Sequence, residues 1–172
     1  MSEKMKNLAY ERHNGYFRKG DNPKPYITHP AAVVNRLLSW GIPEDSPLID
    51  AAWGHDLIED AKVPKEEIVA ASSEEVWQII DMLTYKPEQG SKEGYIKGVA
   101  DSGNRSVLLV KAADRLCNTL EFLETFSRER ARTYIHYADL ILEALKKLPQ
   151  DSAVSKALAE WNELMSDLDS DK

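Results

Sequence analysis

The chain is short of several features that would place it in a specialised class. A single cysteine among 172 residues excludes an internal disulfide, so the fold must rest on its core alone. No apolar run approaches the roughly 20 residues that span a bilayer, and the first residues lack the apolar core of a secretory signal. We therefore expect a cytoplasmic protein with no membrane partner.

Positive charge is also scarce. The chain has 22 lysines and arginines against 29 aspartates and glutamates, a net charge of −7. Proteins that coat nucleic acid neutralise its phosphates with a basic surface, so this balance argues against a nucleic-acid partner. An anionic substrate would need positive charge that is supplied locally.

Composition and periodicity indicate an all-α fold in a single domain that covers residues 1–172, with no repeat or linker. We predict a first helix over residues 4–19, a loop at 20–26, and a second helix from about His29 to Trp40. Asp45 or Ser46 can cap the next helix. The apolar run at 107–113 fits a buried helix or a buried strand, and the absence of any other strand favours helix. Further helices are predicted at 47–60, 64–71, 73–84, 92–100, 105–122, 127–148 and 153–168.

A polar cluster interrupts the predicted helix over residues 47–60. At about 100° per residue, one arc of this helix carries His55, Asp56, Glu59 and Asp60. Like charges at this spacing repel one another, and so many acidic groups in an apolar segment are best explained by a bound cation.

A metal site is the interpretation that accounts for the most residues. The candidate ligands are His29, His55, Asp56 and Asp114. Imidazole nitrogen with carboxylate oxygen suits manganese, iron, zinc or nickel better than calcium and does not choose among them. Beyond these ligands, Glu59 and Asp60 could orient a water and take its proton, which is a hydrolase arrangement.

Positive charge for a phosphorylated substrate could come from the first loop. Arg18 and Lys19 stand at its start, and an arginine can bind a phosphate bidentately. Both could equally be ordinary solvated charges at a helix end. In the predicted helix over 105–122, one face carries Lys111, Asp114, Asn118 and Glu121, a polar stripe that could line a cavity.

Four motifs occur in order between about residues 8 and 122. They are Arg18-Lys19, Pro-Tyr-Ile-Thr-His-Pro at 25–30, His-Asp-Leu-Ile-Glu-Asp at 55–60, and Lys-Ala-Ala-Asp-Arg-Leu-Cys-Asn at 111–118. This ordered set resembles the HD hydrolase domain of RelA/SpoT-type proteins and, by length, the small stand-alone hydrolases of that family.

The resemblance implies an HD-type helical bundle in which His29, His55, Asp56 and Asp114 bind manganese. It further implies that Glu59 and Asp60 activate water and that Arg18, Lys19 and Asn118 contact a nucleotide. The implied reaction removes the 3′-pyrophosphate of guanosine 3′,5′-bis(diphosphate), leaving guanosine diphosphate and pyrophosphate.

Two departures from the family pattern bear on the substrate and the packing. Glu121 stands where the family usually has a threonine near the nucleoside, and Gly54 replaces a leucine before the His-Asp pair. Glu121 could accept a hydrogen bond from a base or a ribose hydroxyl, or it could repel phosphates. Two alternatives therefore stay open: an HD phosphohydrolase for another nucleotide or phosphorylated cofactor, and a non-catalytic nucleotide-binding regulator. The sequence carries no signal for an oligomeric state.

Overall fold

The structure is a computed structural model that describes residues 3–19, 23–125 and 128–170. These residues form the helices α1 (Glu3–Arg12), α2 (Thr28–Ser39), α3 (Pro47–Gly54), α4 (Lys65–Ala71), α5 (Glu74–Leu83), α6 (Lys92–Asp101), α7 (Arg105–Thr125), α8 (Arg128–Lys146) and α9 (Ser152–Ser170), with a 3₁₀ turn η1 (Pro87–Gln89). The only β pairing in the described residues is an isolated bridge between Phe17 and Pro25. The predicted all-α fold is confirmed.

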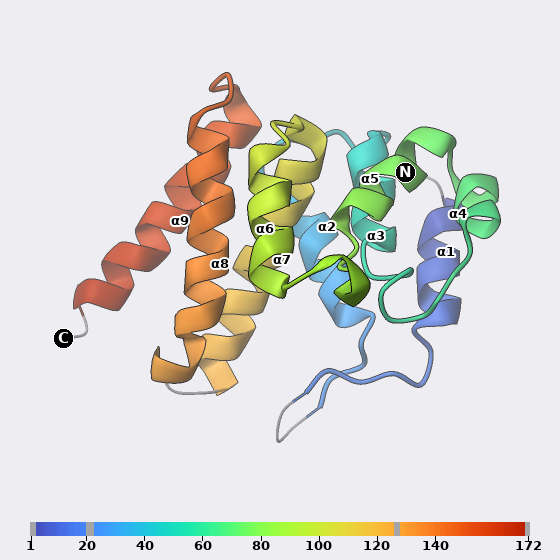
Figure 1. Cartoon of the computed structure of the whole chain (residues 1–172), viewed down its shortest axis with the longest axis horizontal. Coiled ribbons are helices and arrows are strands. Elements are labelled where there is room, and N and C mark those ends of the chain that lie inside the picture. The colour runs from blue at the N-terminus through green and yellow to red at the C-terminus, as the bar shows by residue number, and fades with distance from the viewer. Residues whose placement is uncertain (1–2, 20–22, 126–127, 171–172) are drawn as a thin grey trace.

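Helix α7 organises the bundle. It packs against α2, α3, α5, α6, α8 and α9, and Figure 1 shows α8 and α9 on one side of it and α1 to α5 on the other. The apolar run at its start is fully buried, including Leu108, Leu109 and Val110. The choice of helix for this run is therefore confirmed. Because α7 also carries Asp114 and Asn118, the core of the fold places the candidate site.

The first helix is shorter than the sequence predicts. It ends at Arg12, and Gly15 adopts a φ of +81°, a left-handed conformation that favours glycine. The chain then turns back on itself, since the Arg18 N–H donates to the Lys24 carbonyl at 2.9 Å and the Tyr26 N–H to the Tyr16 carbonyl at 2.8 Å. Arg18 is therefore presented from an extended loop and not from a helix end.

Helix α3 also ends early, at Gly54, and the predicted continuation to residue 60 is wrong. Residues 55–61 form a series of turns, in which the Leu57 N–H donates to the Gly54 carbonyl and the Asp60 N–H to the Asp56 carbonyl. Lys62, with a φ of 54°, follows these turns. At the other end of α3 the Ser46 hydroxyl accepts from the Leu48 N–H at 3.3 Å, so Ser46 is the cap.

Of the helices in the described part of the chain, none combines the length and the apolarity needed to cross a bilayer.

Candidate metal centre and substrate cavity

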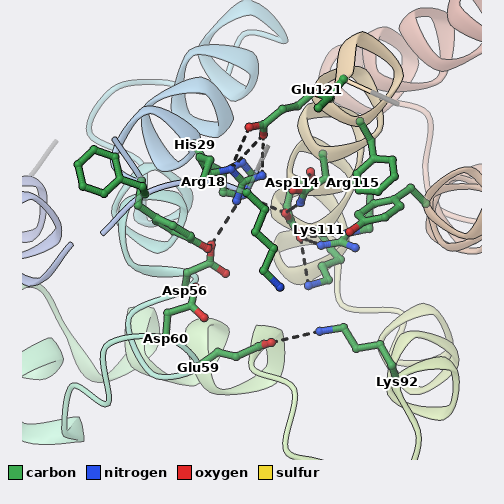
Figure 2. Close-up of a pocket in the computed structure, with 17 residues that line it drawn as sticks. Arg18, His29, Asp56, Glu59, Asp60, Lys92, Lys111, Asp114, Arg115 and Glu121 are labelled. Atoms are coloured by element: carbon green, nitrogen blue, oxygen red, sulfur yellow. Dashed lines mark hydrogen bonds and ion pairs between the residues drawn. The ribbon is translucent and has the colours of Figure 1, made fainter. Parts of the chain in front are cut away.

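All of the candidate site residues except His55 line a cavity of about 400 Å³. Its walls come from the loop around Arg18, the turns after α3, the start of α6, and the facing sides of α7 and α8. Figure 2 shows Asp56, Asp60 and Glu59 on one side of the cavity, and Lys111, Arg115 and Lys92 on the other. The cations on the second side are paired with carboxylates, Lys111 and Arg115 with Asp114 and Lys92 with Glu59.

Four of the predicted groups converge at the inner end of this cavity. The Nε2 atoms of His29 and His55 are 3.2 Å apart, and the Asp114 Oδ1 lies 3.2 Å from the first and 3.9 Å from the second. The Asp56 Oδ2 lies 3.1 Å from the His55 Nε2 and 3.7 Å from the His29 Nε2. Helix α2, the turns after α3 and α7 thus bring together residues up to 85 positions apart in the chain.

These spacings fit a single divalent ion. Two ligand atoms that each lie about 2.1 Å from an ion, at right angles, are about 3 Å apart. The candidate ligand atoms of His29, His55 and Asp114 all lie within 4.8 Å of one another. Asp56 lies outside that group of three but offers a fourth ligand atom, since its Oδ2 is 3.1 Å and 3.7 Å from the two imidazole nitrogens. The arrangement fits a transition ion and does not choose among manganese, iron, zinc and nickel.

The local structure prepares the His55 imidazole as a ligand. Its Nδ1 lies 2.7 Å from the Ala52 carbonyl oxygen, which can only accept, so this nitrogen carries the proton and Nε2 is left to bind a metal. Burial opposes protonation of His55, but the charges of Asp56 and Asp114 and the hydrogen bonds to Asp56 and Ala52 together outweigh it and raise the pKa of His55 to about 9 in the metal-free protein. Burial lowers the pKa of His29.

Asp114 is held by cations on its outer side. Its Oδ2 accepts from the Arg115 Nη2 at 2.8 Å and from the Lys111 Nζ at 3.1 Å, while the Asn118 amide donates to Oδ1. Burial would raise the pKa of Asp114, but Arg115 and Lys111 hold it well below the usual range. The carboxylate therefore stays ionised and is fixed with Oδ1 toward the imidazoles.

Glu59 and Asp60 occupy different positions. The Glu59 carboxylate accepts from the Tyr85 N–H at 3.0 Å and from the Lys92 Nζ at 3.2 Å, so it ties the turns after α3 to the start of α6. Asp60 lies closer to Asp56 (Figure 2), and burial together with the charge of Asp56 raises its pKa, although a hydrogen bond from Tyr26 acts in the opposite direction.

The predicted substrate residues form an ion pair among themselves. The Arg18 Nη2 donates to the Glu121 Oε2 at 2.6 Å and to the Asn118 Oδ1 at 2.7 Å, and the Arg18 Nε donates to Glu121 at 3.0 Å. Burial opposes ionisation of Glu121, but its hydrogen bonds and ion pair with Arg18 lower its pKa. The hydrogen-bonding edge of Arg18 is therefore engaged within the protein, whereas Lys19 lines the cavity.

Several cavity residues were not found from the sequence. Lys92 stands in a helix with no recognisable motif, and Phe122 stacks on Tyr134 at a centroid distance of 4.1 Å to form an aromatic wall. Tyr26 and Arg115, which lie inside the motifs at 25–30 and 111–118, carried a signal that could have been used.

Fold and site together define an all-helical protein with a cluster of histidine and aspartate side chains that could hold a metal ion. The chain is 29% identical over 147 residues to the guanosine-3′,5′-bis(diphosphate) 3′-pyrophosphohydrolase MESH1 of Xenopus tropicalis, covering 81% of this chain and 82% of that protein. Identity to MESH1 of Danio rerio is also 29%, over 146 residues and 81% of each chain. A guanosine-3′,5′-bis(diphosphate) 3′-pyrophosphohydrolase of Aquifex aeolicus is 34% identical over 132 residues, which cover 73% of this chain and 18% of that longer protein.

The fold has a solved counterpart. A structure described as a metazoan ortholog of SpoT that hydrolyses ppGpp superposes with a TM-score of 0.75 at 18% identity, over 92% of this chain and 93% of the other. No protein-family model matches the chain. The resemblance to small stand-alone relatives of the RelA/SpoT-type hydrolase domain, predicted from the ordered motifs, is confirmed by these similarities.

Proposed function

We propose that this protein hydrolyses guanosine 3′,5′-bis(diphosphate) to guanosine diphosphate and pyrophosphate, in the cytoplasm, with a manganese ion held by His29, His55, Asp56 and Asp114. The observation that carries the proposal is the convergence of two imidazole nitrogens and two carboxylate oxygens at spacings that suit one ion. The names of the similar proteins support the choice of substrate.

The ion, when bound, supplies a Lewis acid that polarises the scissile phosphoryl group and makes nearby water more acidic. The water oxygen forms a bond to the phosphorus attached to the 3′ oxygen, and the bond from that phosphorus to the 3′ oxygen breaks. The 3′ oxygen leaves as a hydroxyl after it takes a proton. No covalent intermediate with the protein is required.

We propose that Asp60 accepts the proton from the attacking water. Its raised pKa makes it a better base than an ordinary carboxylate, and it lies beside Asp56 at the cavity wall. Glu59 supports this role in two ways, because its charge contributes to the raised pKa of Asp60 and its bonds to Tyr85 and Lys92 fix the turns that carry both residues.

The phosphates of the substrate need cations, and Lys19 and Lys92 line the cavity where such groups would lie. Arg18 is already paired with Glu121 and Asn118. We therefore propose that Arg18 and Glu121 act as one charge-balanced unit against the nucleoside, with Asn118 beside them, while the lysines contact the phosphates.

The test is product analysis after incubation of the metal-loaded protein with guanosine 3′,5′-bis(diphosphate). Guanosine diphosphate and pyrophosphate are expected in equal amounts, and Asp56→Ala and Asp114→Ala should each abolish turnover. Asp101→Ala, which removes an exposed carboxylate outside the cavity, is the matched control and should leave the rate unchanged. Wild-type rates in either ligand variant would contradict the assignment.

Glu121 favours a second candidate, an HD phosphohydrolase that acts on another nucleotide or a phosphorylated cofactor. The Glu121 carboxylate lines the cavity and would repel a phosphate placed beside Arg18. A panel of nucleotides that differ in the position of their phosphates, assayed with manganese, separates the two candidates by the product that appears first.

A further inference from the structure

Tyr26 lies where several groups of the site meet. Its ring stacks on the His13 imidazole at a centroid distance of 4.8 Å and meets the His29 ring edge-on at 6.3 Å. The Arg18 guanidinium carbon lies 5.2 Å from the centre of the Tyr26 ring. The hydroxyl at the end of this ring donates to the Asp56 Oδ2 at 2.7 Å.

We propose that Tyr26 is a positioning residue of the metal centre, which fixes the Asp56 carboxylate in the orientation that a divalent ion requires. The inference rests on the metal site of the proposed function and not on the identity of the substrate. None of the similar proteins' names assigns a role to this tyrosine.

The oxygen that Tyr26 contacts is the one that faces the imidazoles. Asp56 Oδ2 lies 3.1 Å from the His55 Nε2, and the same oxygen accepts the Tyr26 hydroxyl proton. A carboxylate rotates about its bond to Cβ, so two oxygens could exchange places unless one is held. The single hydrogen bond from Tyr26 removes that freedom and presents the oxygen before the ion arrives.

The hydroxyl has a single hydrogen, and it goes to the metal ligand. Tyr26 donates it to Asp56, so this side chain holds Asp56 and not the proposed base Asp60. Asp60 lies near the same hydroxyl as a second negative charge.

His13 holds the ring of Tyr26 from the side. It is 2% exposed, and neither ring nitrogen has a hydrogen-bond partner among the described residues. A buried polar group without a partner is destabilising, so hydrogen bonding does not explain an imidazole at this position. Its stacked contact with Tyr26 does, since a flat side chain supports the phenol ring without competing for its hydroxyl.

The variant Tyr26→Phe removes the hydroxyl and keeps the ring. The metal-free protein is titrated with Mn²⁺ in the absence of any nucleotide, and free ion is followed by electron paramagnetic resonance. Loss of a residue that hydrogen-bonds to a metal ligand weakens metal binding by about 10–100-fold. We expect the Kd for Mn²⁺ to rise by about this factor. The metal-free variant should unfold in urea close to the wild-type midpoint, because one hydrogen bond contributes little net stability.

Tyr16→Phe is the matched control. Tyr16 is half-exposed, contacts the edge of the same His13 ring, and does not line the cavity. Its loss of a hydroxyl should leave Mn²⁺ affinity unchanged. Equal affinities of Tyr26→Phe and wild type would overturn the role of Tyr26 alone, whereas a wild-type protein that binds no divalent ion would overturn the metal centre as well. Failure to hydrolyse the alarmone would affect neither measurement.

Discussion

Replacing Gly54 with alanine should destabilise the protein, although alanine favours helix over glycine. Gly54 is the last residue of α3 and directly precedes His55. A Cβ at this position would lie 2.6 Å from the Ile80 Cδ1 and 3.3 Å from the Met5 Sδ. Both of these side chains are fully buried, so neither can turn into solvent to make room.

The size of the effect follows from two opposing contributions. Overpacking a close-packed core costs about 1–3 kcal/mol. Alanine in a helix offsets up to about 1 kcal/mol of this relative to glycine. With the full offset, the expected net loss is about 0–2 kcal/mol of unfolding free energy, and the displaced backbone would also carry His55 away from the metal centre.

A double-mutant cycle in urea tests this explanation. Ile80→Val alone should cost about 0.5–1.5 kcal/mol. It removes the Cδ1 that clashes. The next nearest atom of Ile80, Cγ1, is 3.6 Å from the added Cβ, an ordinary contact. Gly54→Ala should therefore cost at least about 1 kcal/mol less when it is combined with Ile80→Val than when it is made alone. Gly98→Ala, where an added Cβ meets nothing within 4 Å, is the control and should not destabilise. Strict additivity of the Gly54 and Ile80 changes would refute the reasoning.

Three further predictions concern pH, a thiol and a helix cap. The raised pKa of His55 favours its protonated form in the metal-free protein, so the stability that His55 contributes is fully present below about pH 6.5 and is lost as the pH rises toward 9. Urea unfolding should show a loss of up to about 3 kcal/mol between these pH values, and a flat profile over that range would contradict this. Burial raises the pKa of Cys117 to about 11, so a thiol reagent at pH 8 should label the folded protein far more slowly than the urea-unfolded protein. Ser46→Ala removes the cap on the Leu48 N–H and should cost about 1 kcal/mol, measured by thermal unfolding, and no loss would show that the cap is dispensable.

Most helices could be predicted because apolar residues recur at helical spacing within them. The errors lie at the ends of the helices. The predicted first helix ran past Arg12 and the third past Gly54, and in each case a glycine lies at or near the true end. Apolar periodicity continued beyond these points, since Leu57 is fully buried although it lies in a turn. Tertiary packing, and not local periodicity, decides where such helices stop.

The site was predictable to the extent that its residues belong to short motifs. His29, His55, Asp56 and Asp114 could be chosen from the sequence, and the structure brings their side chains together. The pairing of Arg18 with Glu121, 103 positions away, leaves no periodic signal. The same holds for Lys92 and Glu59, 33 positions apart. Such contacts follow from how the loop around Arg18 lies against α7 and how the turns after α3 lie against α6. The sequence pattern does not specify this packing.

The central claim is that one divalent ion sits between His29, His55, Asp56 and Asp114 and that hydrolysis depends on it. Equilibrium dialysis of the metal-free protein against Mn²⁺, followed by elemental analysis, tests it most directly. We predict one ion per chain in the wild type and a loss of that ion in Asp114→Ala, with turnover of guanosine 3′,5′-bis(diphosphate) restored only on metal addition to the wild type. Full turnover in protein shown to be free of metal would contradict the account.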